Sequence, residues 1–186
     1  MEKLKVFDVV LQDDDIGFQA VSFVDEPAIL QDMVYFNKAK VPVMMQVSDK
    51  QEVVSPILIP NQLIFRKNEE TGEQFYIRWS EETIDEIAVR FMLSGLHNNT
   101  TIMHPTFYDK SLALEDCLVE DVYLKRLWII DDDKTDEANT KYGFDLPVGT
   151  LMVHYKIYND PLWQRIKKGE LRGLSVEAFV SMVKAY

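Results

Sequence analysis

Leu174-Ser-Val-Glu-Ala-Phe-Val-Ser-Met182, close to the end of the chain, alternates in the period-2 pattern of a β-strand. The alternation places Leu174 and Val176 on one face of the strand and Ser175 and Glu177 on the other. The glutamate at position 177 also excludes the Gly-x-Ser-x-Gly elbow of the α/β-hydrolases. Ser175 is therefore expected to sit on a strand, either as a surface residue or as a nucleophile.

More strand-like segments precede this one, and two helices have clear boundary signals. Residues 3–11 and 18–24 are rich in valine, phenylalanine and leucine, and the polar turn between them predicts a hairpin. A helix is indicated between the N-cap residue Ser80 and Gly95, and another begins at Asp160-Pro161. Further strand candidates are residues 53–66, 73–79, 100–104, 118–130 and 150–158. The pattern predicts a β-dominated α+β fold.

One domain is expected over residues 1–186. A chain of 186 residues that is 47% hydrophobic can bury one sizeable core. Residues 1–36 hold the N-terminal strands, and residues 37–52 show no clear period and are interpreted as a connector. Residues 53–186 form the core that contains the candidate catalytic residues.

Composition excludes several classes of function. The 20 basic and 31 acidic residues give a net charge of −11, which repels phosphate backbones and disfavours nucleic acid. No N-terminal signal core and no run of about 18 apolar residues is present, so neither secretion by a standard signal nor a membrane span is expected. Cys117 is the only cysteine, and the acidic loop 131–139 lacks the spacing of a calcium loop. With no phosphate-binding glycine loop either, we expect no metal and no cofactor.

The search for a base that could activate a serine is short, because the chain has three histidines. His97 lies where a helix is expected to end and is interpreted as exposed. His154 falls in the middle of a strand and is interpreted as a packed or half-exposed residue. His104 ends an extended segment, and Pro105 favours an extended backbone at His104 itself. His104 is thus the candidate base.

Glu120 is the candidate acid. Its period-2 companions are Leu118, Val122 and Leu124, so a regular strand would turn the carboxylate toward the core. A buried carboxylate needs a partner, and orienting an imidazole is one known use. Two alternatives stay open: a bulge could turn Glu120 outward, or an arginine could pair with it structurally.

Several blocks spread over most of the chain carry a family resemblance. They are residues 20–29, 56–66, 75–84, 98–104, 118–120, 149–153, 160–163 and 169–177, the last containing Gly173-Leu-Ser-Val-Glu177. In this order they resemble the XkdF-like phage serine proteases, relatives of the prohead proteases. Members of that family often continue past the serine strand into a charged tail, which suggests that a chain ending at Tyr186 is a processed form.

The resemblance implies a serine endopeptidase with Ser175 as nucleophile, His104 as base and Glu120 as the third member. Other candidates for the third role are Glu115, Asp121 and His154. It also implies a fold like that of the herpesvirus capsid protease (assemblin), a small closed or nearly closed β-barrel flanked by helices. Triads tolerate any chain order, which suits the order of histidine, acid and serine in this sequence.

The expected role follows from the same resemblance. The protein would cleave capsid and scaffold proteins during phage head maturation, in the host cytoplasm and within the assembling prohead or virion, and could act as a homo-oligomer. One alternative is a non-catalytic head component that keeps the protease fold. Another is a module that binds peptides at an exposed sheet edge by strand addition.

Overall fold

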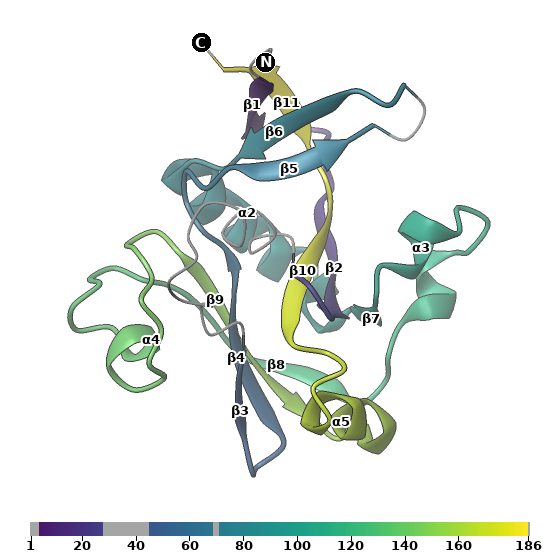
Figure 1. Ribbon diagram of the computed structural model, residues 1–186, viewed down its shortest axis with the longest axis vertical. Coiled ribbons are helices and arrows are strands. Elements are labelled where there is room, and N and C mark those ends of the chain that lie inside the picture. The colour runs from purple at the N-terminus through teal and green to yellow at the C-terminus, as the bar shows by residue number, and fades with distance from the viewer. Residues whose placement is uncertain (1–3, 28–44, 69–70, 186) are drawn as a thin grey trace.

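Figure 1 shows a computed structural model of the chain, in which residues 4–27, 45–68 and 71–185 are described. Among the described residues, strand residues clearly outnumber helical residues. The strands form three separate sheets. The β-dominated α+β class predicted from the sequence is confirmed. No sheet closes into a barrel within the described ranges, so the barrel is not found.

The first sheet has the strand order β11-β1-β6-β5. Its members are β1 (Lys5–Val10), β5 (Ile64–Lys67), β6 (Gln74–Arg78) and β11 (Ser181–Lys184). The predicted hairpin of residues 3–11 and 18–24 is wrong, because β1 pairs with β6 and β11 and not with the strand that follows it. The turn between these two segments does not close a hairpin. Its Asp15 carboxylate accepts instead from the backbone N–H of Ser181, at 3.1 Å, near the end of the chain.

The second sheet has the order β10-β2-β7 and contains the candidate site. Its members are β2 (Gly17–Val24), β7 (Thr100–Ile102) and β10 (Gly173–Phe179). β2 lies in the middle, antiparallel to β10 and parallel to β7. The strand expected over residues 174–182 is divided at Val180, so the end of the chain contributes β10 to this sheet and β11 to the first (Figure 1).

The third sheet has the order β3-β4-β9-β8. Its members are β3 (Gln46–Ser48), β4 (Glu52–Leu58), β8 (Val122–Ile129) and β9 (Leu151–Ile157). The predicted strand 53–66 is thus divided between β4 and β5. The first half of the predicted connector, residues 37–44, lies outside the described residues, and its second half includes β3. β8 begins four residues later than residue 118, which changes the expected position of Glu120.

Four helices are described: α2 (Glu81–Leu93), α3 (Pro105–Tyr108), α4 (Glu137–Thr140) and α5 (Asp160–Lys167). Short 3-10 turns lie at Leu96–Asn98 and Leu114–Cys117. The cap predicted at Ser80 is confirmed, since its side chain accepts from the backbone N–H of Thr83. α5 is capped by Asn159 instead of Asp160, through a bond from the N–H of Leu162. α4 forms inside the segment expected to be a loop.

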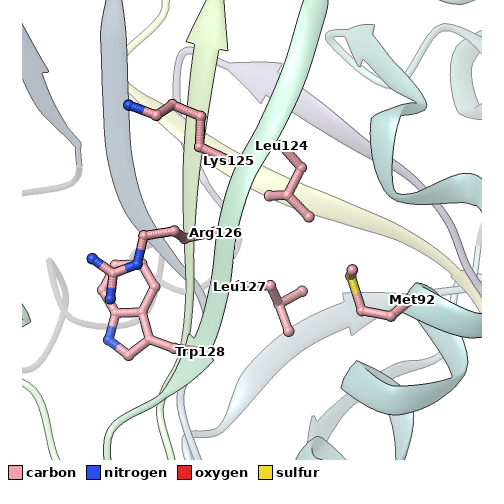
Figure 2. Close-up of a pocket in the computed structure, with 6 residues that line it drawn as sticks. All are labelled: Met92, Leu124, Lys125, Arg126, Leu127 and Trp128. Atoms are coloured by element: carbon pink, nitrogen blue, oxygen red, sulfur yellow. The ribbon is translucent and has the colours of Figure 1, made fainter.

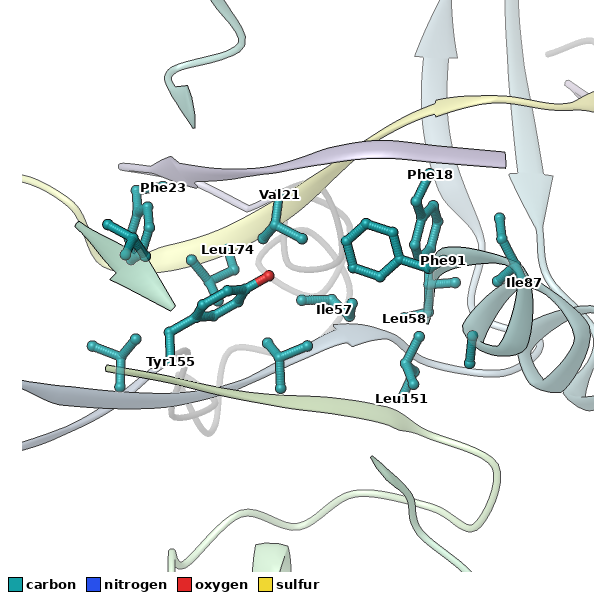
Figure 3. Close-up of a cluster of buried hydrophobic side chains, with 14 of the residues drawn as sticks. Phe18, Val21, Phe23, Ile57, Leu58, Ile87, Phe91, Leu151, Tyr155 and Leu174 are labelled. Atoms are coloured by element: carbon teal, nitrogen blue, oxygen red, sulfur yellow. The ribbon is translucent and has the colours of Figure 1, made fainter. Parts of the chain in front are cut away.

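The main hydrophobic core lies between the second and third sheets (Figure 3). Val21, Phe23 and Leu174 enter it from β2 and β10, and Tyr155 enters from β9. One end is closed by α2, where Phe91 stacks edge to face on Phe18 with ring centroids 5.4 Å apart. Since the second sheet buries its apolar side chains here, its polar side chains lie on the opposite face.

Gly173, at the start of β10, packs against Pro27 beyond the end of β2. A Cβ at position 173 would lie 2.5 Å from the Pro27 Cγ, so the space at this glycine is filled by the proline ring and is not free for a substrate chain. We expect Gly173→Ala to lower the free energy of unfolding by about 1–3 kcal/mol, because the ring or the strand must shift. Thermal and urea unfolding measure this.

A double variant provides the control. Pro27→Ala removes the ring atoms that the new Cβ would meet, so Gly173→Ala should cost less in that background than in the wild type. Equal costs in both backgrounds would show that this contact does not determine the effect.

Candidate active site

The candidate site occupies the face of the β10-β2-β7 sheet that points away from the main core. Leu174 and Val21 point into the core in Figure 3, so the neighbouring residues Ser175 and Ser22 belong to the other face. Strand register places Ser175 directly opposite Ser22, and Ser22 directly opposite Thr101 of β7. Three hydroxyl side chains therefore form a row across the sheet. Ser175 is only 7% exposed.

His104 follows β7 and has an unusual backbone conformation. Met103 and His104 both have left-handed backbones, with φ of 61° and 48°. The extended conformation expected before Pro105 is wrong, because Pro105 begins α3 and His104 is the residue that precedes its first turn. Left-handed conformations in non-glycine residues cost of order 1 kcal/mol or more each and cluster at functional sites. The turn keeps the His104 side chain at the sheet, 25% exposed.

Glu177 lies beside the His104 ring. Its Oε1 is 3.6 Å from the Nδ1 of His104 and also accepts from Ser22 Oγ at 2.7 Å and from Thr101 Oγ1 at 2.5 Å. Its Oε2 accepts from Thr106 Oγ1 of α3 at 3.1 Å. Both carboxylate oxygens are thus held, and the side chain is 11% exposed.

These contacts keep Glu177 ionised. Burial alone would raise the pKa of this carboxyl, but His104 and the hydroxyls of Thr101 and Ser22 outweigh burial and lower the pKa to about 2. A carboxylate with so low a pKa is a poor proton acceptor near neutral pH. It is suited to orient an imidazole and to stabilise the imidazolium cation.

Ser175 lies on the same face of the sheet as the Glu177–His104 pair, without a direct hydrogen bond to His104 in the described structure. Ser175 and Glu177 point to the same face of β10, two residues apart, and Glu177 contacts His104. The His104 nitrogen nearest to Glu177 is Nδ1, which leaves Nε2 as the nitrogen available to a serine. In catalytic triads the acid binds Nδ1 and the serine binds Nε2.

Glu120 is not part of this group. The prediction that it points toward the core is wrong: Glu120 is exposed, in the loop before β8, and its backbone carbonyl accepts from the side chain of Asn159. The strand pattern used to orient it starts at Val122. Asp121, whose φ is 61°, breaks the extended backbone just before that point.

The three other candidates for the third role also lie elsewhere. Glu115 and Asp121 are exposed, and Asp121 accepts from the hydroxyl of Tyr123. His154 is buried in the third sheet, where its Nε2 lies 3.0 Å from Glu52 Oε2, so it is a packed residue as expected. Burial lowers the pKa of His154, although Glu52 acts to raise it. His97, interpreted as exposed, is half-buried.

A groove of about 400 Å³ lies along β8 (Figure 2). It is lined by Met92, Leu124, Lys125, Arg126, Leu127 and Trp128. Leu124 and Leu127 point toward Met92 of α2 in this view. None of these lining residues is a carboxylate, a histidine or a hydroxyl, and the Lys125 ammonium is paired with Glu52 at 2.7 Å. The pairing of β8 is also irregular between Leu124 and Arg126, a feature that opposes strand addition at a sheet edge.

Neither a membrane-spanning helix nor a metal-binding cluster is present in the described part of the chain. No helix there has the length and apolar character needed to cross a membrane. Within residues 4–27, 45–68 and 71–185, histidine, cysteine and acidic side chains do not gather in a group of three that could bind a metal ion.

Comparisons of the chain with protein-family models, with curated proteins and with solved structures gave no match. The resemblance to the XkdF-like proteases therefore depends on the sequence blocks between residues 20 and 177 alone.

Proposed function

We propose that this chain is a serine endopeptidase with Ser175 as nucleophile, His104 as base and Glu177 as the orienting acid. The observation that supports it best is the contact of His104 Nδ1 with Glu177 Oε1, 3.6 Å apart, on the sheet face that also contains Ser175. The left-handed turn at Met103 and His104 adds support, because two consecutive left-handed residues are costly and such conformations cluster at active sites.

In the proposed reaction, Ser175 Oγ attacks the carbonyl carbon of a peptide bond while Nε2 of His104 takes its proton. The tetrahedral intermediate collapses to an acyl-enzyme, and the imidazolium donates the proton to the leaving amine. Water then attacks the ester through the same base, which releases the acid product and restores the Ser175 hydroxyl. Glu177 stays a carboxylate throughout, since its pKa of about 2 makes it too weak a base to accept the proton.

The substrate class is proposed from the sequence blocks. They resemble those of phage prohead proteases, which suggests that the substrates are capsid and scaffold proteins in the assembling head, within the host cytoplasm. A barrel like that of the herpesvirus capsid protease is proposed on the same basis. The three separate sheets of the described residues agree with the coarser α+β class.

The main alternative is a structural head component that keeps the fold and has no activity. The 7% exposure of Ser175 favours it, as does the missing hydrogen bond from the Ser175 hydroxyl to His104 within the described residues. Catalytic hydrogen bonds are often long or absent before a substrate binds, so both proposals are compatible with this geometry.

Labelling with a fluorophosphonate separates the two. An activated serine attacks the phosphorus and expels fluoride, so we expect one adduct, on Ser175, found by mass spectrometry of the digested protein. The rate should fall to background in Ser175→Ala and in His104→Ala. Ser48→Ala, which changes an exposed serine of β3, is the matched control and should label like the wild type. No adduct on the folded wild-type chain would favour the structural alternative.

A further inference from the structure

Two buried hydroxyls beside Glu177 take no part in the proposed proton transfers. Ser22 of β2 and Thr101 of β7 are both 0% exposed, and their hydroxyl oxygens are 2.5 Å apart. They occupy neighbouring positions of the same row that begins with Ser175. Neighbouring strands of a sheet lie about 4.7–4.9 Å apart, so this row brings the hydroxyls together.

The hydroxyls of Ser22 and Thr101 lie within hydrogen-bonding distance of the Glu177 carboxylate and of each other, and their two protons can serve two of these three contacts at once. Each has one proton to donate, and Glu177 Oε1 accepts from Ser22 at 2.7 Å and from Thr101 at 2.5 Å. Apart from each other, neither hydroxyl has another side-chain partner in the described part of the chain. A buried hydroxyl without an acceptor and a buried carboxylate without donors are both costly, so the three groups depend on one another.

The contacts also fix the direction of the carboxylate. Oε1 accepts from the two strand hydroxyls and faces His104 Nδ1, whereas Oε2 accepts from Thr106 of α3. A rotation about the last side-chain bond of Glu177 would break contacts on both sides. Backbone hydrogen bonds already pair β2 with β7, so the hydroxyls are not needed to join the strands.

We propose that Ser22 and Thr101 are positioning residues, which hold Glu177 ionised and turned toward His104. This inference builds on the proposed function, in which Glu177 orients the base. It adds a requirement that the triad alone does not contain: a hydroxyl at position 22 and another at position 101.

The test compares Thr101→Val, which keeps the shape and loses the hydroxyl, with Thr101→Ser, which keeps the hydroxyl. The titration of Glu177 is followed by carbon-13 NMR of its carboxyl in the full chain. Loss of one donor to a charged acceptor should raise the Glu177 pKa by about one unit in Thr101→Val. Thr101→Ser should return the pKa toward the wild-type value. Cleavage should slow about tenfold in Thr101→Val, mainly in kcat, with the same partial recovery in Thr101→Ser.

The titration decides this inference independently of catalysis. If the wild-type chain cleaves nothing, the proposed function is wrong. The Glu177 pKa would still show whether Ser22 and Thr101 hold this carboxylate ionised. An unchanged Glu177 pKa in folded Thr101→Val would overturn the inference. Should Thr101→Val fail to fold, Ser22→Ala removes the other donor with a smaller change in packing, and an unshifted Glu177 titration there would equally overturn it.

Discussion

Alanine at Ser175 or at His104 is expected to slow cleavage of a capsid or scaffold protein by roughly 10⁴- to 10⁶-fold. In the proposed mechanism, Ser175 supplies the bond-forming oxygen and His104 accepts its proton. Cleavage is measured by gel and mass spectrometry with purified protein. Circular dichroism should show a folded chain for both variants, because neither side chain belongs to the hydrophobic core.

The double variant gives a sharper test of a shared role. Residues that act as a unit lose their effect together, so Ser175→Ala in combination with His104→Ala should be no slower than either single variant. His97→Ala and Ser48→Ala are the matched controls, since both positions lie outside the site, and both should cleave at wild-type rates. Multiplied losses in the double variant would mean that the two residues act independently.

Local patterns predicted most of the secondary structure correctly. Alternation placed strands close to β2, β6 and β9, and the Ser80 cap placed α2. These signals depend on short-range physics: period-2 burial in a strand, and side-chain capping of free amides at a helix start. For the same reason, the sequence alone could predict that Leu174 and Ser175 point to opposite faces of their strand.

Those local patterns could not predict which distant segments pair with one another. The turn after β1 has the composition of a hairpin loop, but Asp15 bonds to Ser181, 166 residues later in the chain. The error at Glu120 has a related cause. A period-2 argument orients a side chain only where the strand is continuous, and here the strand begins at Val122, after a left-handed Asp121.

The position of Glu177, the proposed acid, on the same strand face as Ser175 can be read from the sequence. Ser175 and Glu177 are two residues apart in one strand, so their side chains must share a face. What the sequence could not show is that Ser22 and Thr101 lie beside Glu177 as donors, since that depends on the strand order β10-β2-β7. The spacing Ser-x-Glu therefore indicates a candidate site only when the neighbouring strands place further polar side chains, such as Ser22 and Thr101, on the same face.

Glu177→Gln is expected to slow cleavage by about 10⁴-fold, the size of effect known for an acid-to-amide change in a Ser-His-Asp triad. Glutamine keeps the shape of the side chain and loses the charge that stabilises the His104 imidazolium. It also offers one oxygen in place of two to the hydroxyls of Ser22, Thr101 and Thr106. The loss should appear in kcat more than in KM, because the substrate does not contact this carboxylate in the proposed mechanism.

The same variant should change the response to acid. The Glu177 pKa is about 2 in the folded chain against 4.5 for an ordinary glutamate, which corresponds to about 3 kcal/mol of stabilisation by the ionised form. Because the folded pKa is the lower one, this stabilisation is complete above pH 4.5 and is lost as the pH falls toward 2. Urea unfolding of Glu177→Gln should therefore depend less on pH across that window.

Glu120→Gln, an exposed control, should match the wild type in both rate and acid response. A large loss of cleavage in Glu120→Gln with full activity in Glu177→Gln would return the third role to Glu120.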